Sequence, residues 1–205
     1  QTVGHDWAID LLNHALRNER LAHAYLFVGL KRVCKDTLAT EFAAALNCTG
    51  QEPPCGECPA CRKTLGGAHP DVITIMPQNG KIKIEQVREM QRQMALSPYE
   101  GRLRVCLISS MHLATTEAAN ALLKSLEEPP ARVVLLLTAT SIELLPPTVV
   151  SRCQVLQLRP VAGDTIQHTL RRREGQNQQQ AELLSRIAAG RIGWAVAAAR
   201  DAGLV

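Results

Sequence analysis

The 205-residue chain is poor in aromatic side chains and contains no long apolar run. Phe, Tyr and Trp make up 3% of the residues although hydrophobic residues reach 46%, so aliphatic side chains and alanine must form most of the core. No stretch of about 18 consecutive apolar residues occurs, which argues against a membrane span. No signal peptide is visible, but the chain starts at Gln1 without a methionine and looks like a fragment. We expect a cytoplasmic protein.

Neither sign of charge dominates the sequence. Lys and Arg number 23 against 19 Asp and Glu, and the net charge of +4 is compatible with nucleic acid nearby without indicating it. Four of the 7 cysteines are clustered, which fits a metal site in a reducing compartment better than a disulfide framework. The length suits one sizeable domain with a smaller one.

Short apolar runs alternate with helical patterns up to residue 160. The expected strands cover residues 25–28, 72–75, 104–109, 133–138 and 155–158. The expected helices cover residues 6–18, 35–46, 84–96 and 115–126, and residues 50–67 read as an irregular insertion rich in Gly, Pro and Cys. This alternation predicts an α/β fold with an open, mostly parallel five-stranded sheet that helices cover on both faces.

The sequence changes character after Pro160. Helical patterns at residues 165–173, 180–189 and 193–201 follow one another without a strand, and a polar linker at 174–180 separates the first two. We therefore expect an α/β domain over residues 1–161, with a metal module inserted at about 48–67, and a small all-helical domain over residues 162–205.

A degenerate phosphate-binding loop follows the first expected strand. A working loop reads Gly, four residues, Gly-Lys-Ser/Thr, in which backbone N–H groups hold the phosphates and the hydroxyl ligates magnesium. Here Gly29 and Lys35 are present, but Cys34 replaces the second glycine and Asp36 replaces the hydroxyl residue. The Cβ of Cys34 would crowd the backbone, and the Asp36 carboxylate would repel a polyphosphate. Lys35 could still contact an anion, although we expect it in solvent at the helix start.

The third expected strand lacks the acidic residues of a nucleotide hydrolase. In such enzymes an aspartate at the end of this strand positions magnesium, and a glutamate orients the attacking water. The corresponding residues here are Ser109 and Ser110. Neither hydroxyl can hold magnesium as a carboxylate does or act as a general base at neutral pH. Two separate sites thus lack what hydrolysis needs; a fold that never was an ATPase is the alternative explanation.

Four closely spaced cysteines are the strongest chemical signal in the sequence. Cys48, Cys55, Cys58 and Cys61 have the spacing C-x6-C-x2-C-x2-C, which lets four thiolates surround one tetrahedral zinc ion. Four protein ligands would close the coordination shell, so we expect a structural rather than a catalytic zinc. Two disulfides or a redox pair are the alternative. The other three cysteines are expected to pack as small hydrophobic residues.

Several further motifs resemble the AAA+ clamp-loader subunits of bacterial DNA polymerase III. They are residues 23–27 (HAYLF), 120–130 (NALLKSLEEPP), 151–153 (SRC) and 69–71 (HPD), and the clustered cysteines lie where that family inserts its zinc module. The resemblance covers essentially the whole chain and implies an AAA+ P-loop domain followed by a helical lid domain. Members of the family continue into a C-terminal collar domain, which we expect to lie beyond the end of this chain.

The resemblance also separates branches of that family. Gamma and tau are its ATP-hydrolysing motors, whereas delta prime has degenerate loops and lacks the strand-three acids, as this chain does at Cys34, Asp36, Ser109 and Ser110. This similarity implies a non-hydrolysing subunit, in a hetero-oligomer with gamma or tau and delta, that helps load the sliding clamp onto primed DNA. It implies structural zinc and no productive ATP or magnesium site.

Two other functions stay open from the residues. One is an active gamma/tau-type ATPase, in which Glu117 is the nearest acid that could replace the missing one. The other is a free-standing zinc module that binds nucleic acid, although its cysteine loop has few basic residues and no aromatic ones for stacking.

The family resemblance makes Arg152, with Ser151 and Cys153, an arginine finger. Its guanidinium would reach the γ-phosphate of ATP bound by a neighbouring motor subunit and offset the charge of the transition state. The alternative is an exposed loop arginine in a surface ion pair. Residues 138–140 lie at the family's sensor position and receive no role here. Gly193 stands where nucleotide-sensing relatives carry an arginine.

Overall fold

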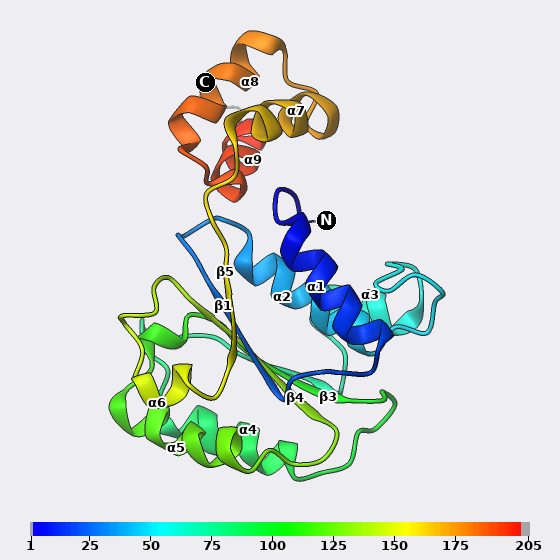
Figure 1. Ribbon diagram of the computed structural model, residues 1–205, viewed down its shortest axis with the longest axis vertical. Coiled ribbons are helices and arrows are strands. Elements are labelled where there is room, and N and C mark those ends of the chain that lie inside the picture. The colour runs from blue at the N-terminus through cyan, green and yellow to red at the C-terminus, as the bar shows by residue number, and fades with distance from the viewer. Residues whose placement is uncertain (1, 202–205) are drawn as a thin grey trace.

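A five-stranded parallel sheet forms the centre of the structure, a computed structural model that describes residues 2–201 (Figure 1). The strands are β1 (Ala24–Val28), β2 (Val72–Ile75), β3 (Arg104–Ile108), β4 (Val133–Ala139) and β5 (Gln154–Gln157). They are ordered β2-β3-β4-β1-β5, and each neighbouring pair is parallel. The predicted α/β fold with an open parallel sheet is therefore confirmed.

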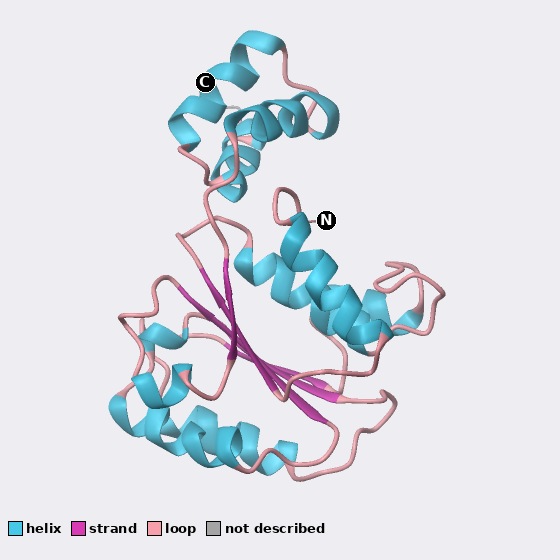
Figure 2. Ribbon diagram, viewed as in Figure 1, coloured by secondary structure: helices cyan, strands magenta, loops and turns pink. Residues whose placement is uncertain are grey.

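Helices cover both faces of this sheet (Figure 2). One face carries α1 (Asp6–Arg17), α2 (Lys35–Leu46) and α3 (Pro59–Leu65), and the other carries α4 (Ile84–Met94), the 3-10 turn η1 (Met111–Leu113), α5 (Thr116–Glu127) and α6 (Pro147–Val150). Tyr25 and Phe27 belong to the core on the first face, whereas Leu26 belongs to the core on the second. Because successive strand residues face opposite layers and both layers are buried, the strands read as continuous apolar runs.

The cysteine-rich insertion contains a short helix, α3. The helix begins after Cys58, whose sulfur accepts a hydrogen bond from the N–H of Cys61, and Pro59 occupies its first turn. The expectation of irregular chain throughout residues 50–67 is therefore wrong for Pro59–Leu65. Proline at the first position of a helix has the backbone angle that a helix needs, so it marks a start there and not a break.

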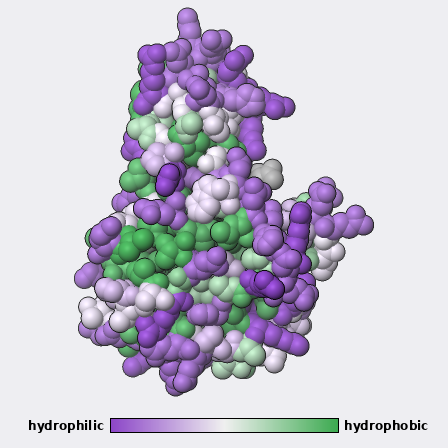
Figure 3. All heavy atoms as spheres, viewed as in Figure 1, coloured by the Kyte–Doolittle hydropathy of each residue, from purple (hydrophilic) through white to green (hydrophobic). Residues whose placement is uncertain are grey.

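Three helices, α7 (Gly163–Arg173), α8 (Gln178–Ala188) and α9 (Ile192–Arg200), form a bundle above the carboxyl ends of the strands (Figure 1). They enclose a hydrophobic core of their own, to which Ile166, Leu170 and Leu184 contribute. Hydrophilic residues cover the tip of the bundle, and hydrophobic side chains gather on the α/β part below it (Figure 3). The division into domains at residues 161 and 162 stays a prediction. Within residues 2–201 no helix has both the length and the apolarity that crossing a bilayer requires.

The start of α9 lies against the loop that follows β1. The N–H of Gly193 donates to the carbonyl oxygen of Arg32 at 2.8 Å, and a Cβ at residue 193 would lie 2.9 Å from the same oxygen. A larger residue at this position would therefore push the bundle away from the loop. Arg191 turns back toward its own segment, where its guanidinium lies 6.0 Å from the Trp194 ring and donates to the Ala188 carbonyl.

A buried aspartate ties the start of β2 to the segment before β3. Asp71 is completely buried, and its carboxylate accepts hydrogen bonds from the N–H groups of Tyr99, Glu100 and Gly101 at 2.7, 2.8 and 2.7 Å. The Arg104 guanidinium lies 3.2 Å away. Burial alone would raise the pKa of Asp71, but the three N–H groups and Arg104 together lower it. The aspartate of the HPD motif thus has a structural role.

Replacing Asp71 with asparagine is expected to lower the free energy of unfolding by about 2–4 kcal/mol near neutral pH, because an amide group would face N–H donors and leave Arg104 unpaired. The pKa of Asp71 is lower in the folded state than its unfolded value of about 3.9, so the contribution is complete above that pH. It is lost as the pH falls through the folded-state pKa. Urea unfolding at neutral pH and at about pH 3 measures both effects. The exposed substitution Asp10→Asn is the control, and equal stability of Asp71→Asn and wild type at neutral pH would contradict this account.

Candidate functional site

The positions that depart from a working nucleotide site, Cys34, Asp36, Ser109 and Ser110, meet at the carboxyl edge of the sheet, where the strand order reverses. β1 lies between β4 and β5, and β3 lies on the far side of β4, so the loop after β1 lies beside the end of β4 and reaches the turn after β3 through Thr138. In open α/β sheets, ligand sites form outside the carboxyl ends of the strands at such a point. The fold therefore brings the loop at residues 29–36 together with Ser109 and Ser110 after β3 and with Thr138 near the end of β4.

Cys34 keeps the backbone conformation that a glycine would have in this loop. Its φ of 70° and ψ of 22° are left-handed, which costs a residue with a Cβ about 1–2 kcal/mol. The side chain packs at the edge of the helical-bundle core, and burial is the main reason that the pKa of its thiol is raised. The backbone at residue 34 is thus left-handed although no glycine stands there, and the Cys34 sulfur lies between the loop and the bundle.

The structure corrects the expected position of Lys35. Only 4% of this residue is exposed, so the prediction of a solvated lysine is wrong. Its ammonium donates to the Leu30 carbonyl at 3.3 Å and lies 3.9 Å from a carboxylate oxygen of Asp36. Burial lowers the pKa of Lys35, and the nearby Asp36 partly offsets this effect. The lysine is folded back onto its own loop.

Asp36 joins three elements of the site. The hydroxyl of Thr138 donates to the Asp36 carboxylate at 2.6 Å and accepts a hydrogen bond from the Ser110 N–H at 2.9 Å. The carboxylate thus links the start of α2 with β4 and with the turn after β3. In a working loop the hydroxyl at this position would bind magnesium. Thr138, to which the sequence pattern assigned no role, is therefore a structural partner of Asp36.

The turn after β3 presents hydroxyl groups where a hydrolase has acids. Ser109 is largely buried and Ser110 has a left-handed backbone, with a φ of 58°. Glu117, the candidate replacement, lies in the first turn of α5. Hydrogen bonds from its own backbone and from the Thr115 hydroxyl lower the pKa of its carboxyl. Glu117 therefore acts as part of the helix start.

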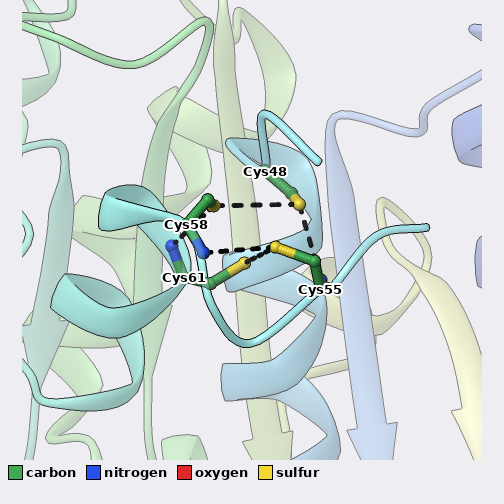
Figure 4. A group of neighbouring side chains, drawn as sticks. All are labelled: Cys48, Cys55, Cys58 and Cys61. Atoms are coloured by element: carbon green, nitrogen blue, oxygen red, sulfur yellow. Dashed lines mark hydrogen bonds between the residues drawn. The ribbon is translucent and has the colours of Figure 1, made fainter. Parts of the chain in front are cut away.

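The four clustered cysteines converge on one point (Figure 4). Their sulfur atoms all lie within 4.8 Å of one another. The Cys58–Cys48 and Cys55–Cys61 sulfur pairs are 3.9 and 4.0 Å apart, close to the roughly 3.8 Å between ligands of a tetrahedral zinc with Zn–S bonds of about 2.3 Å. A disulfide would need about 2.05 Å, and all four cysteines are free thiols. This geometry could hold a zinc ion.

Backbone N–H groups surround these sulfur atoms. The Cys48 sulfur accepts from Gly50, the Cys55 sulfur from Cys58, and the Cys58 sulfur from Cys61. Hydrogen bonds from the backbone of Thr49 and Cys61 lower the pKa of Cys58 to about 5, whereas burial raises the pKa of Cys61 to about 12. Such N–H groups stabilise thiolates, the form of cysteine that binds metal.

Arg152 lies between α6 and β5, at the amino end of β5 and thus away from the carboxyl edge that carries the loop after β1. Its guanidinium pairs with the Glu127 carboxylate at 2.8 Å and donates to the Thr148 carbonyl at 2.9 Å, and its side chain is 34% exposed. Cys153 packs instead against the core, and burial raises the pKa of its thiol to about 12. Ser151 is exposed. Within the motif, Cys153 thus packs against the core while the Arg152 side chain reaches the surface.

The strand order, the loop after β1 and the helical bundle above it define a P-loop domain of the AAA+ type. The fold is similar to the RuvB Holliday junction branch migration motor of Thermotoga maritima, with a TM-score of 0.67 and 16% identity, over 97% of this chain and 61% of that one. It is also similar to a DNA polymerase III gamma subunit-related protein of the same organism. That TM-score is 0.63, with 20% identity over 87% of this chain and 58% of the other.

Sequence comparisons define the family within this class. Residues 4–162 match the family described as DNA polymerase III, delta subunit. DNA polymerase III subunit tau of Salmonella typhimurium is 36% identical over 197 residues, which cover 93% of this chain and 30% of the relative. DNA polymerase III subunit delta' of Bacillus subtilis is 34% identical over 161 residues, which cover 78% of this chain and 49% of the relative. The chain belongs to the AAA+ clamp-loader subunit family of DNA polymerase III.

These matches cover different branches of the family. The chain spans about a third of the tau relative and about half of the delta' relative. Since tau and delta' are both similar to it, the comparisons establish the family and not the branch.

Proposed function

We propose that this chain belongs to a clamp-loader subunit of the delta prime type, which hydrolyses no ATP itself. It would join gamma or tau and delta subunits in a hetero-oligomer that places the sliding clamp on primed DNA during replication, in the cytoplasm. The observation that carries this proposal is the Asp36 carboxylate, which stands at the magnesium-binding position and is bonded to Thr138.

Three features of the site support the loss of hydrolysis. Asp36 brings a negative charge to the place where a polyphosphate and its magnesium would bind. Ser109 and Ser110 offer no carboxylate, and the Glu117 carboxyl accepts hydrogen bonds from its own backbone and from the Thr115 side chain at the start of α5. The bundle reaches the loop through the backbone of Gly193 and not through an arginine. Each change removes a group that an ATPase uses, so the active gamma/tau-type motor is the weaker alternative.

The proposed contribution of this subunit to catalysis is Arg152, acting in trans. Its partly exposed guanidinium is paired with Glu127 at the end of α5 and would reach the γ-phosphate of ATP on a neighbouring motor subunit. A planar cation that is held in place offsets the charge that develops in the transition state. Ser151 and Cys153 would hold the arginine's backbone.

The proposed cofactor is one structural zinc ion, held by Cys48, Cys55, Cys58 and Cys61. When bound, the ion would cross-link the insertion to the end of α2, because Cys48 follows α2 and Cys61 lies in α3. The Cys61 sulfur also approaches the Ala44 carbonyl at 3.8 Å. Four ligands leave no open position, so the ion would stabilise the fold and take part in no reaction.

Reconstitution with the full-length subunits of the same organism tests the proposed function. Loading of a fluorescently labelled clamp onto primed DNA is expected to require this subunit, together with the motor subunits and delta. Omitting it should abolish loading, and adding it back should restore loading. Equal loading without it would contradict the proposal.

A further inference from the structure

Two motifs that lie apart in the sequence meet at Arg152. Glu127 is the last residue of α5 and belongs to the NALLKSLEEPP segment, whereas Arg152 belongs to the SRC segment. The Arg152 Nη2 atom lies 2.8 Å from Glu127 Oε1, and Nη1 donates to the Thr148 carbonyl at 2.9 Å and to the Ser151 hydroxyl at 3.2 Å. The guanidinium is therefore held from two sides.

These contacts leave the guanidinium able to bind a further anion. They use at most three of the five N–H groups that an arginine side chain carries, and the side chain is 34% exposed. An arginine without partners samples many rotamers, and it loses this freedom when it binds a phosphate. The ion pair with Glu127, whose side chain is 50% exposed, restricts that freedom in advance. The helix that carries Glu127, α5, is packed against the sheet through Leu122 and Leu126.

We propose that Glu127 is a positioning residue for Arg152, which sets its guanidinium in the direction of the neighbouring subunit before assembly. The inference rests on the proposed role of Arg152 as an arginine finger. Glu127 itself contacts no nucleotide in this account. It acts only through the arginine, so its removal should affect the rate of the chemical step and leave the affinity for ATP unchanged.

The test compares four variants of the full-length subunit in the reconstituted assembly: Glu127→Gln, Arg152→Ala, the double variant, and Glu128→Gln. Glu128 is an exposed glutamate in the same segment and serves as the matched control. Single-turnover ATP hydrolysis at the site facing this subunit is expected to slow about three- to tenfold in Glu127→Gln, the scale of one exposed ion pair. The half-saturating ATP concentration should not change. Glu128→Gln should match wild type.

The double variant shows whether Glu127 acts through Arg152. Glu127→Gln should have no further effect once Arg152 is alanine. In NMR relaxation measurements on the full-length subunit, the Arg152 Nε–H group should be ordered in wild type and mobile in Glu127→Gln. A general loss of structure would make other arginines mobile as well.

The outcomes separate this inference from the proposed function. If Arg152→Ala leaves hydrolysis unchanged, the arginine finger itself is wrong and the inference falls with it. If Arg152→Ala slows hydrolysis but Glu127→Gln does not, or if Glu127→Gln slows it equally in the Arg152→Ala background, only the positioning role is overturned. Faster hydrolysis in Glu127→Gln would also overturn it, because the pair would then restrain the arginine.

Discussion

Replacing Arg152 with alanine is expected to slow ATP hydrolysis at the neighbouring motor subunit by about 10³-fold or more, the usual contribution of an arginine finger. The fold should survive, because the ion pair with Glu127 is partly exposed and such pairs contribute about 1 kcal/mol or less. The measurement is single-turnover phosphate release from the reconstituted assembly, in which only the site next to this subunit is left active.

Two further substitutions sharpen that experiment. Arg152→Lys keeps the positive charge but loses the planar fork, so it should recover only a small part of the rate. Arg159→Ala removes an exposed arginine at the opposite end of β5 and should leave the rate unchanged. An Arg152→Ala assembly that hydrolyses ATP as fast as wild type would show that the arginine is only a surface residue.

Removing zinc is the second change from which we expect a large effect. Metal analysis of the purified protein should find one zinc ion per chain, and chelation should lower the Tm by more than about 10 °C. That shift corresponds to a few kcal/mol for a domain of this size, and structural zinc ions contribute at least as much. Hydrogen exchange should rise first at residues 48–67, because the cysteine cluster is the hydrophobic centre of this insertion.

One substitution separates metal binding from packing. Cys58→Ser keeps an acceptor for the N–H of Cys61 at the start of α3 but removes a thiolate ligand, so it should reproduce the effect of the chelator. Glu57→Gln changes an exposed neighbour and is the matched control. A purified protein with two disulfides in place of zinc, or an unchanged Tm after chelation, would contradict the metal site.

The fold and the cysteine cluster could be predicted because their signals are local. Continuous apolar runs between amphipathic helical segments indicate a parallel sheet, and this pattern can be recognised without knowing any tertiary contact. The four cysteines lie within 14 residues of sequence, so their spacing alone brings them together. The replacements at Cys34 and Asp36 could likewise be read directly, since the loop has a fixed pattern of residue types.

The contacts within the site could not be predicted because they depend on tertiary structure. The Thr138 hydroxyl donates a hydrogen bond to Asp36, which lies 102 positions earlier in the sequence, and only the adjacency of β1 and β4 brings the two together. Lys35 stands at a helix start, where most lysines are solvated, and nothing in its neighbours shows that it folds back onto Leu30. The Glu127–Arg152 pair likewise requires the packing of α5 beside α6.

The degenerate nucleotide site can be reversed in part. The double substitution Cys34→Gly/Asp36→Thr should relieve the left-handed strain and restore the magnesium ligand, so it is expected to gain affinity for magnesium-ATP. It should still not hydrolyse ATP, because Ser109 and Ser110 supply no acid. Calorimetric titration and a phosphate-release assay measure the two properties separately. Unchanged affinity would show that Cys34 and Asp36 are not what blocks the loop.

Titration of the wild-type protein with magnesium-ATP shows directly whether the loop after β1 binds nucleotide. With a gamma-type subunit as positive control, we expect no binding up to about 1 mM ATP and no phosphate release, because Asp36 repels the polyphosphate and no carboxylate activates water. Micromolar binding accompanied by turnover would contradict the account and make this chain a motor of the gamma/tau type.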